Sequence, residues 1–318
     1  MRKALLLLSF LFLLSCRQES IGPLNGVMVV YSPELAEFID GGGLEDLHLV
    51  VETVDPEQVL SFSYANLQEF TGTLRERRIV LMLLSPEDQG QIPGDLEETS
   101  GGIYSGRDIW ALNQHVFAVV VNGGGIPEEL PAVIEEAYDQ QMHAYLYRSF
   151  VSTSMTSQAR IDSLRSLGFS LDVPKSYETR KWTAEDGFVQ YQRQPDEECM
   201  LLLSINVIHG FSQTELTPEN AMLAREAMAR TWFFDASEDS VDRARTTFEP
   251  VTSGGLSGIQ LTGVWRNPEY LNAGSFTSRV LDAGDEWYIL DLEVYNPGHA
   301  KEPYLREGWI IMDTFVKE

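Results

Sequence analysis

Residues 79–84 read Ile-Val-Leu-Met-Leu-Leu, and this uninterrupted apolar run decides how the first half of the chain folds. A strand that meets water on one face alternates apolar and polar residues, whereas a strand covered on both faces is apolar throughout. Similar runs occupy residues 27–30 and 116–121. The three runs therefore predict a central sheet whose strands are covered on both faces.

A long helical segment is predicted after Pro127. Its apolar face follows from spacings of three and four positions. The residues on that face are Ile134, Tyr138, Met142, Tyr145, Leu146 and Ser149. Hydroxyl residues at 152–154 predict a break, because they compete for backbone hydrogen bonds, and Gly168 is suited to the end of the segment. A shorter helix is predicted over residues 64–70.

After Gly168 the pattern changes to that of an antiparallel sheet. Residues 188–192 and 200–208 predict a hairpin across the acidic turn at 195–198. Three further strands are predicted over 258–265, 275–281 and 287–295, and a final helix over 304–315. Thr217 is predicted to cap a helix that runs to Trp232.

The strand over 287–295 reads Trp-Tyr-Ile-Leu-Asp-Leu-Glu-Val-Tyr. Because side chains alternate along a strand, its apolar residues at 288, 290, 292 and 294 share one face. Asp291 and Glu293 share the other face. Carboxylates are almost never fully buried unless they are paired, so we expect water on that side of the strand.

These elements predict an α+β fold. The first half, residues 26–168, is mixed α/β with a central sheet and a long helix. The second half, residues 169–318, is largely antiparallel with two helices. The halves are either separate domains or parts of one core.

Residues 1–16 have the pattern of an export signal. Arg2 and Lys3 precede an apolar run from Ala4 to Leu14 that is shorter than the about 20 residues of a membrane-spanning helix. Leu13-Leu14-Ser15-Cys16 resembles the lipobox of bacterial lipoproteins. That resemblance implies a signal peptide over residues 1–15 and acyl chains, such as palmitate, on Cys16. Residues 17–25 are predicted to be a short tether with a reach of at most about 30 Å.

The charge of the chain limits its partners. Removal of the signal peptide takes the formal charge from −25 to −27, because it removes Arg2 and Lys3 and no acidic residue. Nucleic acid repels such a protein, and anionic lipid offers it no attraction. We expect membrane attachment through acylated Cys16 and no nucleic-acid partner. The partners that the charge leaves are an envelope protein or a glycan.

No motif for catalysis, a cofactor or a metal is found in the sequence. The histidines are scattered singly, without the short spacings of a zinc site. Residues 235–242 are rich in carboxylates but lack the central glycine and final glutamate of an EF-hand loop. We interpret them as a solvated acidic loop, with weak calcium binding as the alternative. Cys199 lies in an apolar run, which favours a buried, inert thiol.

Two tryptophans are candidates for a ligand-binding groove. Trp110 with Gln114, and Trp265 with Arg266, combine an aromatic ring with a polar group, as binding sites do. Core packing with a satisfied hydrogen bond is the alternative, and the residue types favour it.

Several stretches in order resemble the DUF4837 family, lipoproteins of unknown function found in Bacteroidetes-type bacteria. The stretches are Arg78-Ile79-Val80-Leu81, Asp108–Gln114, Leu167-Gly168-Phe169 through Tyr177, Gly263-Val264-Trp265, Tyr295-Asn296-Pro297 and Tyr304-Leu305-Arg306. The resemblance covers most of the mature chain and implies lipidation, an envelope location and an α+β fold. Thr262 departs from the pattern, which has an arginine there.

The leading hypothesis from the sequence is a lipid-anchored cell-envelope protein that binds or scaffolds another component without catalysis. The alternative is an envelope hydrolase that acts on glycan or peptide through carboxylates. We expect an outer-membrane anchor facing the periplasm, because Cys16-Arg17-Gln18-Glu19-Ser20 contains a single acidic residue after the cysteine.

Overall fold

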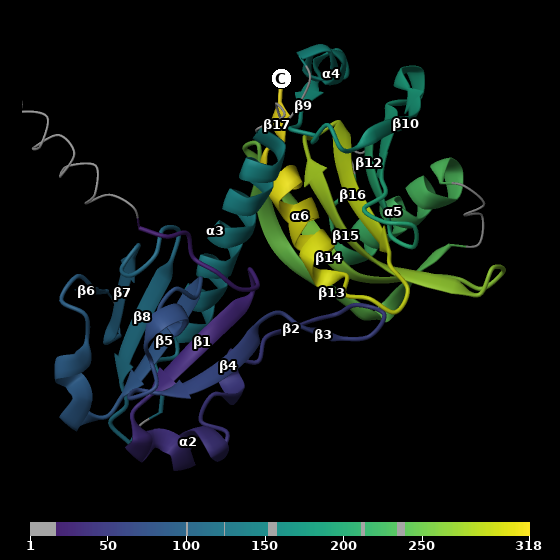
Figure 1. The fold of residues 1–318 in the computed structure, drawn as a ribbon. Coiled ribbons are helices and arrows are strands. Elements are labelled where there is room, and N and C mark those ends of the chain that lie inside the picture. Colours follow the sequence, from purple (N-terminus) through teal and green to yellow (C-terminus); the bar gives the residue numbers. More distant parts are fainter. Residues whose placement is uncertain (1–16, 100, 124, 152–157, 211–213, 234–238) are drawn as a thin grey trace, which may run out of the picture. The chain divides into compact units, whose positions relative to one another are not determined.

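The computed structural model describes residues 17–99, 101–123, 125–151, 158–210, 214–233 and 239–318 (Figure 1). These residues form two compact units. Unit 1 is the chain up to Leu49 together with Gln58–Gln141, and unit 2 is Val50–Glu57 together with Met142–Glu318. The main division between the units falls inside a helix, between Gln141 and Met142. It is earlier in the chain than residue 168, at which the change of sequence pattern predicts the boundary between the halves.

The apolar runs of the first half lie at the centre of a mixed sheet in unit 1. Its strands are β1 (Gly26–Tyr31), β4 (Ser61–Asn66), β5 (Ile79–Leu84), β6 (Glu97–Glu98), β7 (Ile103–Arg107) and β8 (His115–Val120). They lie in the order β4-β1-β5-β8-β7-β6, with the first four parallel and the last two continuing antiparallel. Every residue of β5 is buried. The prediction of strands covered on both faces is confirmed.

Short helical turns complete unit 1. They are α2 (Ala36–Asp40) and 3-10 turns at Pro33–Leu35, Glu45–Leu47, Gly72–Leu74 and Pro86–Gln91. The helix predicted over 64–70 is wrong, because β4 occupies its first half and pairs with β1 in parallel, Val29 opposite Tyr64. Ladder hydrogen bonds to a neighbouring strand outweigh a weak local preference for helix.

Residues predicted to form the tether are hydrogen-bonded to unit 1. The amide of Ser20 donates to the carbonyl of Leu112 (2.9 Å), and that of Ile21 donates to Glu76 (2.8 Å). Ser20 is only 2% exposed. The described part of this stretch therefore packs on unit 1.

The helix α3 (Leu130–Val151) confirms the long helix predicted after Pro127. Ile134, Tyr138, Met142 and Leu146 are buried, but Tyr145 is 52% exposed. Spacing identifies the face of a helix but not how far along its length that face is covered. The Ser149 side chain and the break at 152–154 lie outside the described part. Among the described helices, none is long and apolar enough to cross a bilayer.

Unit 2 is built on an antiparallel sheet in the order β10-β11-β12-β16-β15-β14-β13. Its strands are β10 (Glu178–Thr183), β11 (Phe188–Arg193), β12 (Met200–His209), β13 (Ser240–Ser253), β14 (Leu256–Asn267), β15 (Asn272–Asp282) and β16 (Glu286–Tyr295). The small pair β9 (Phe169–Ser170) and β17 (Val316–Lys317), the helix α4 (Gln158–Arg165) and a turn at Ala184–Asp186 complete it. The hairpin predicted across residues 195–198 is confirmed as β11 and β12.

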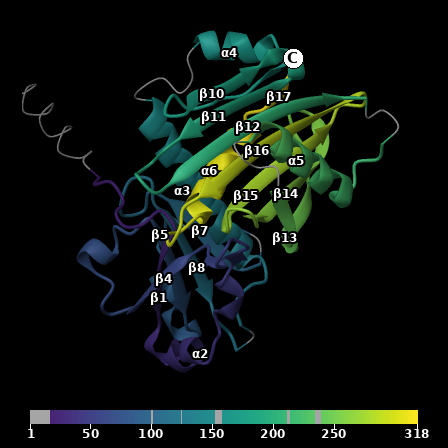
Figure 2. The same cartoon turned by 90° about the vertical axis from the view of Figure 1, so that its right-hand side faces the viewer.

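Two helices cover opposite faces of this sheet (Figure 1, Figure 2). The helix α6 (Glu302–Asp313) lies on β15 and β16, where Gly308 allows it to approach Leu292 closely. The helix α5 (Pro218–Trp232) lies on the other face, where Arg225 reaches Asp291. Since neighbouring residues on a strand face opposite ways, Asp291 and Leu292 identify the two faces.

The expectation that Asp291 and Glu293 face water is wrong. Asp291 is fully buried and Glu293 is 5% exposed. The face of β16 that carries them is covered by α5, which brings an arginine to pair with both carboxyls.

The segment Val50–Glu57 belongs to unit 2, although in the sequence it lies between the two parts of unit 1. It contains β2 (Val50–Val51) and the first residue of β3 (Glu57–Gln58). The amide of Val54 donates to Ser275 Oγ (3.2 Å). The Glu57 carboxylate accepts from the amides of Lys301 (2.8 Å), the residue before α6, and Glu302 (2.9 Å), its first residue. Unit 2 therefore takes a helix cap from a distant part of the chain.

Candidate functional site

A row of polar side chains crosses the buried centre of the unit 2 sheet. Gln190, Ser204, Asp291 and Ser278 lie on adjacent strands, each opposite the next. All four are at most 1% exposed, on the face that α5 covers. Gln190 Nε2 donates to Ser204 Oγ (3.1 Å). Buried polar groups cost free energy unless they are paired, so this row demands an explanation beyond packing.

Arg225 of α5 is the partner of the buried acids. Its Nε donates to Asp291 Oδ1 (2.7 Å) and its Nη2 donates to Glu293 Oε1 (2.7 Å). The guanidinium carbon lies 3.7 Å from the centroid of the Phe276 ring. Arg225 is 1% exposed. One cation thus bridges two carboxyls inside the protein.

The local sequence explains why α5 places Arg225 there. Thr217 caps the helix as predicted, because its Oγ1 accepts from the amide of Asn220 (3.2 Å), and Pro218 fixes the first turn. The buried stripe of α5 contains Ala221, Met222, Met228 and Ala229, and Arg225 lies within it at helical spacing. The helix therefore presents a cation from its apolar face.

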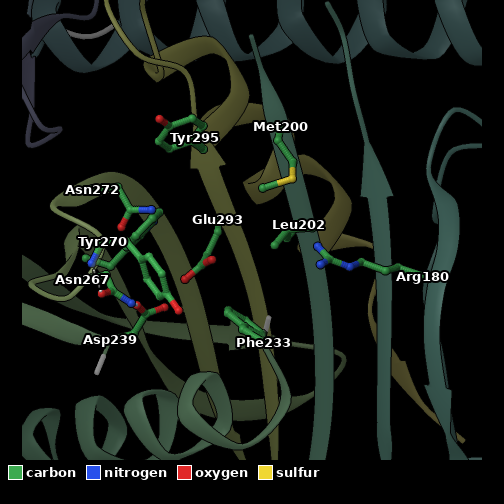
Figure 3. Close-up of a pocket in the computed structure, with 11 residues that line it drawn as sticks. Arg180, Met200, Leu202, Phe233, Asp239, Asn267, Tyr270, Asn272, Glu293 and Tyr295 are labelled. Carbon is green, nitrogen blue, oxygen red and sulfur yellow. Dashed lines mark hydrogen bonds between the residues drawn. The ribbon is translucent and has the colours of Figure 1, made fainter. Parts of the chain in front are cut away.

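A pocket of about 330 Å³ opens beside this charge cluster. Glu293 is part of its wall, and Figure 3 shows the side chain pointing from β16 toward the space between Tyr270 and Leu202. The aromatic side chains of its wall are Phe233, Trp265, Tyr270 and Tyr295. Met200 and Leu202 of β12 add apolar surface, and Arg180 of β10 lies at the far side in Figure 3.

The turn between β14 and β15 supplies the polar end of the pocket. Asn267 Nδ2 donates to Asp239 Oδ1 (2.6 Å), and its Oδ1 accepts from the amides of Glu269 and Tyr270 (3.0 Å each). Asn267 therefore fixes both Asp239 and the backbone that carries Tyr270. Asn272 also lines the pocket, and its buried Oδ1 has no partner among the described residues.

Both carboxyls of the pocket have raised pKa values. Burial raises the pKa of Glu293 to about 8; the charges of Asp291 and Asp239 add to the rise, and Arg225 opposes it. Burial also raises the pKa of Asp239, against the hydrogen bond from Asn267. A single guanidinium cannot neutralise all these carboxyls, so the cluster retains a proton near neutral pH.

The candidate residues from the sequence lie in different places. Trp265 lines the pocket, whereas Arg266 points elsewhere and pairs with Asp242. Trp110 packs edge-on against Phe70 in unit 1, with ring centroids 5.2 Å apart. Cys16 lies outside the described residues.

Gln114 is fully buried and holds a loop of unit 1. Its Oε1 accepts from the amide of Trp110 (3.0 Å), and its Nε2 donates to the carbonyls of Arg75 (2.6 Å) and Arg77 (2.7 Å). All of its hydrogen-bonding groups are therefore used within the protein, which leaves none for a ligand.

Glu293, Asp239 and Arg225 are not among the site residues predicted from the sequence. For Asp239 the interpretation as part of a solvated loop is wrong, because this residue is 6% exposed; residues 234–238 lie outside the described part. A usable signal was present: an arginine within the apolar stripe of α5 needs a buried acid, and the carboxylates of β16 are the matching pair.

No group of three or more histidine, cysteine, aspartate or glutamate side chains in the described part of the chain is arranged to hold a metal ion. Cys199 is buried, and burial raises the pKa of its thiol.

Comparison with known proteins gives a family and weak structural likenesses. The profile of a family described as "Domain of unknown function (DUF4837)" matches residues 156–314, which lie in unit 2. No curated protein matches the sequence.

Three solved structures are similar to parts of the chain. CyanoP, the PsbP protein of Synechocystis sp. PCC 6803, has a TM-score of 0.34 at 12% identity, over 48% of this chain and 88% of its own. LpqN of Mycobacterium tuberculosis, described as involved in cell envelope biogenesis, has a TM-score of 0.29 at 12% identity, over 46% and 82%. A protein of Bacteroides thetaiotaomicron has a TM-score of 0.28 at 8% identity, over 48% and 45%.

Proposed function

The chain belongs to the DUF4837 family, for which no activity is described, and we propose that it is a lipid-anchored cell-envelope protein that binds a small molecule without converting it. The observation that carries the binding role is the pocket of unit 2, with Glu293 and Asp239 at its polar end and aromatic walls. Concave sites with mostly apolar walls and a few fixed polar groups are typical of small-molecule binding.

The anchor is Cys16, attached to the outer membrane and facing the periplasm. Arg17, the residue after it, donates through its guanidinium to the carbonyl of Asp108 in unit 1. With residues 18–21 also bonded to unit 1, little free chain separates Cys16 from that unit. The anchor therefore keeps unit 1 near the bilayer.

The anchor is tested with Cys16→Ser in living cells, with Cys199→Ser as the matched control. We expect Cys16→Ser to lose labelled palmitate and to leave the membrane fraction, while Cys199→Ser keeps both. Palmitate labelling of the Cys16→Ser variant would refute lipidation at this site. Digestion of the wild-type protein by protease added to intact cells would refute the periplasmic orientation.

Ligand binding is tested by NMR on protein with nitrogen-15 in its tryptophans. The indole signal of Trp265 is assigned by its loss in Trp265→Phe. A library of small fragments is then added, and we expect those fragments that bind in the pocket to shift this signal. Leu202→Trp fills the pocket and should abolish these shifts. Leu223→Trp, at a 47% exposed position of α5, should leave them unchanged. If no fragment moves the Trp265 signal, the binding role is wrong.

A hydrolase is the second candidate, because Glu293 and Asp239 share the pocket and both have raised pKa values. Glycan hydrolysis by two carboxyls needs one of them ionised and a cleft that admits a polymer. Here Glu293 is held by Arg225, and about 330 Å³ suits a small molecule. Turnover of cell-wall glycan or peptide that is lost in both Glu293→Gln and Asp239→Asn would make the protein an enzyme.

A further inference from the structure

The buried charges around the pocket do not balance. Arg225 faces Asp291 and Glu293, and Asp239 is near enough to raise the pKa of Glu293. Among the lining residues the one arginine is Arg180, at an exposed position of β10. The interior therefore carries more acid than base. A cation that enters the pocket meets favourable charge in a region of low dielectric constant.

Glu293 offers an oxygen to such a cation. Its side chain is 7% exposed, and its Oε1 accepts from Arg225. Within the described part of the chain, no hydrogen bond involves Oε2. Figure 3 shows the carboxyl directed into the pocket. A carboxyl that is more than nine-tenths buried and keeps an unbonded oxygen on the side of the cavity has an acceptor available to a ligand.

The walls indicate what kind of cation fits. Phe233, Trp265, Tyr270 and Tyr295 surround the acids with aromatic surface, and Met200 and Leu202 add apolar contact. Aromatic faces attract organic cations, and an apolar wall favours a ligand with hydrocarbon around its charge. A metal ion instead needs several oxygen ligands arranged around it. Here one of the two carboxyls already binds Arg225.

We propose that the ligand of this pocket is an organic ammonium ion, with its charge against Glu293 and Asp239 and its alkyl groups against the aromatic walls. This inference rests on the proposed binding function and specifies the class of ligand. A quaternary ammonium fits this chemistry because it needs no hydrogen-bond acceptors and places methyl groups against aromatic rings.

Binding is coupled to the ionisation of Glu293. The groups that face it are Arg225 from α5, Asp291 from its own strand and Asp239 from the segment before β13. Arg230 and Asn267 act on Asp239, and Arg180 lies across the pocket. A cation favours the charged carboxylate and so displaces its proton. The affinity for a permanently charged ligand therefore increases as the pH rises toward 9.

The test uses three probes of the same shape on the full mature protein: choline, 3,3-dimethylbutan-1-ol and 3,3-dimethylbutyrate. They carry a positive, a zero and a negative charge on similar carbon skeletons. We expect choline to bind about tenfold more tightly than the alcohol at pH 8, and the carboxylate to bind most weakly. Calorimetric titration or the Trp265 indole signal gives the affinities.

Glu293→Gln and Asp239→Asn should each reduce the preference for choline over the alcohol. Glu293→Gln should also remove the rise of choline affinity between pH 6 and pH 9. Asp282→Asn, at an exposed end of β15, is the matched control. Circular dichroism establishes that each variant is folded.

The inference is overturned if the alcohol or the carboxylate binds as tightly as choline, if choline does not bind, or if the preference survives in both variants. These outcomes leave the binding function standing when other fragments move the Trp265 signal. If no compound of any charge moves that signal, the binding function itself fails.

Discussion

The strands β5 of unit 1 and β16 of unit 2 are both central and almost completely buried, but their chemistry differs. β5 contains only apolar residues. β16 carries the buried side chains of Asp291 and Glu293 on the face that α5 covers. The core cluster around β5 is formed by apolar side chains, whereas the core around β16 also depends on one arginine that reaches it from α5. A buried ionic cluster adds little stability as a whole, but it becomes very costly when one member is lost.

The largest effect is expected from Arg225→Met. This variant leaves Asp291 and Glu293 buried without a counter-charge, which should cost about 3–5 kcal/mol in the free energy of unfolding. Urea denaturation of the purified mature protein measures it. Arg266→Met is the matched control, because Arg266 pairs with Asp242 with 58% of its side chain exposed. The control should change stability by about 1 kcal/mol or less.

A triple variant separates charge from packing in this result. Arg225→Met combined with Asp291→Leu and Glu293→Leu removes every charge of the cluster and keeps the core filled. Its stability should return to within about 1 kcal/mol of the wild type, or exceed it. If the triple variant is as unstable as Arg225→Met, the loss comes from packing and the contrast with β5 disappears.

The next effect compares the same substitution in both units. Leu81 in β5 and Leu203 in β12 are fully buried. Each change to alanine should cost about 3 kcal/mol, since the cost depends on the buried side chain and the cavity left. Hydrogen exchange should increase in β1 and β8 for Leu81→Ala, and in β11 and β16 for Leu203→Ala. Increased exchange in neither set would show that these leucines do not support their sheets.

A smaller effect is expected from pH, and only the core around β16 should produce it. The folded state raises the pKa of Glu293 from 4.5 to about 8, so between these values the folded protein holds a proton that the unfolded chain has released. The stability from this group is complete below about pH 4.5 and is lost as the pH rises to about 8. The slope is at most about 1.4 kcal/mol per pH unit.

Urea denaturation at pH 5, 6, 7 and 8 measures this slope in the wild type and in Glu293→Gln. Asp291 and Asp239 have raised pKa values as well and contribute with the same sign in both proteins. The variant should therefore have the flatter curve. Equal slopes would mean that Glu293 keeps an ordinary pKa in the folded state.

The contrast between the two strands also explains what the sequence could predict. An apolar run such as residues 79–84 indicates burial on both faces by itself, and Thr217-Pro218 fixes the start of α5 locally. The environment of Asp291 depends on Arg225, which lies 66 positions earlier in the chain. Alternation along β16 identified the correct face but not what covers it. Likewise Trp265 is a candidate from its residue type, whereas Asp239 lies in the pocket beside Asn267, a hydrogen-bond partner 28 positions later in the chain.

The smallest effect concerns the segment that unit 2 takes from the first half of the chain. Glu57 caps α6 from this segment, because its carboxylate accepts from the amides of Lys301 and Glu302 at the start of the helix. Glu57→Ala should cost about 1 kcal/mol, because these buried donors lose their acceptor and the helix start loses a favourable negative charge. Hydrogen exchange at residues 304–306 should increase.

The control is Glu57→Gln, which keeps an acceptor oxygen and should lose less free energy of unfolding than Glu57→Ala. If the two variants lose the same amount, charge rather than hydrogen bonding stabilises the start of the helix. Either result measures how far unit 2 depends on residues outside its own continuous stretch.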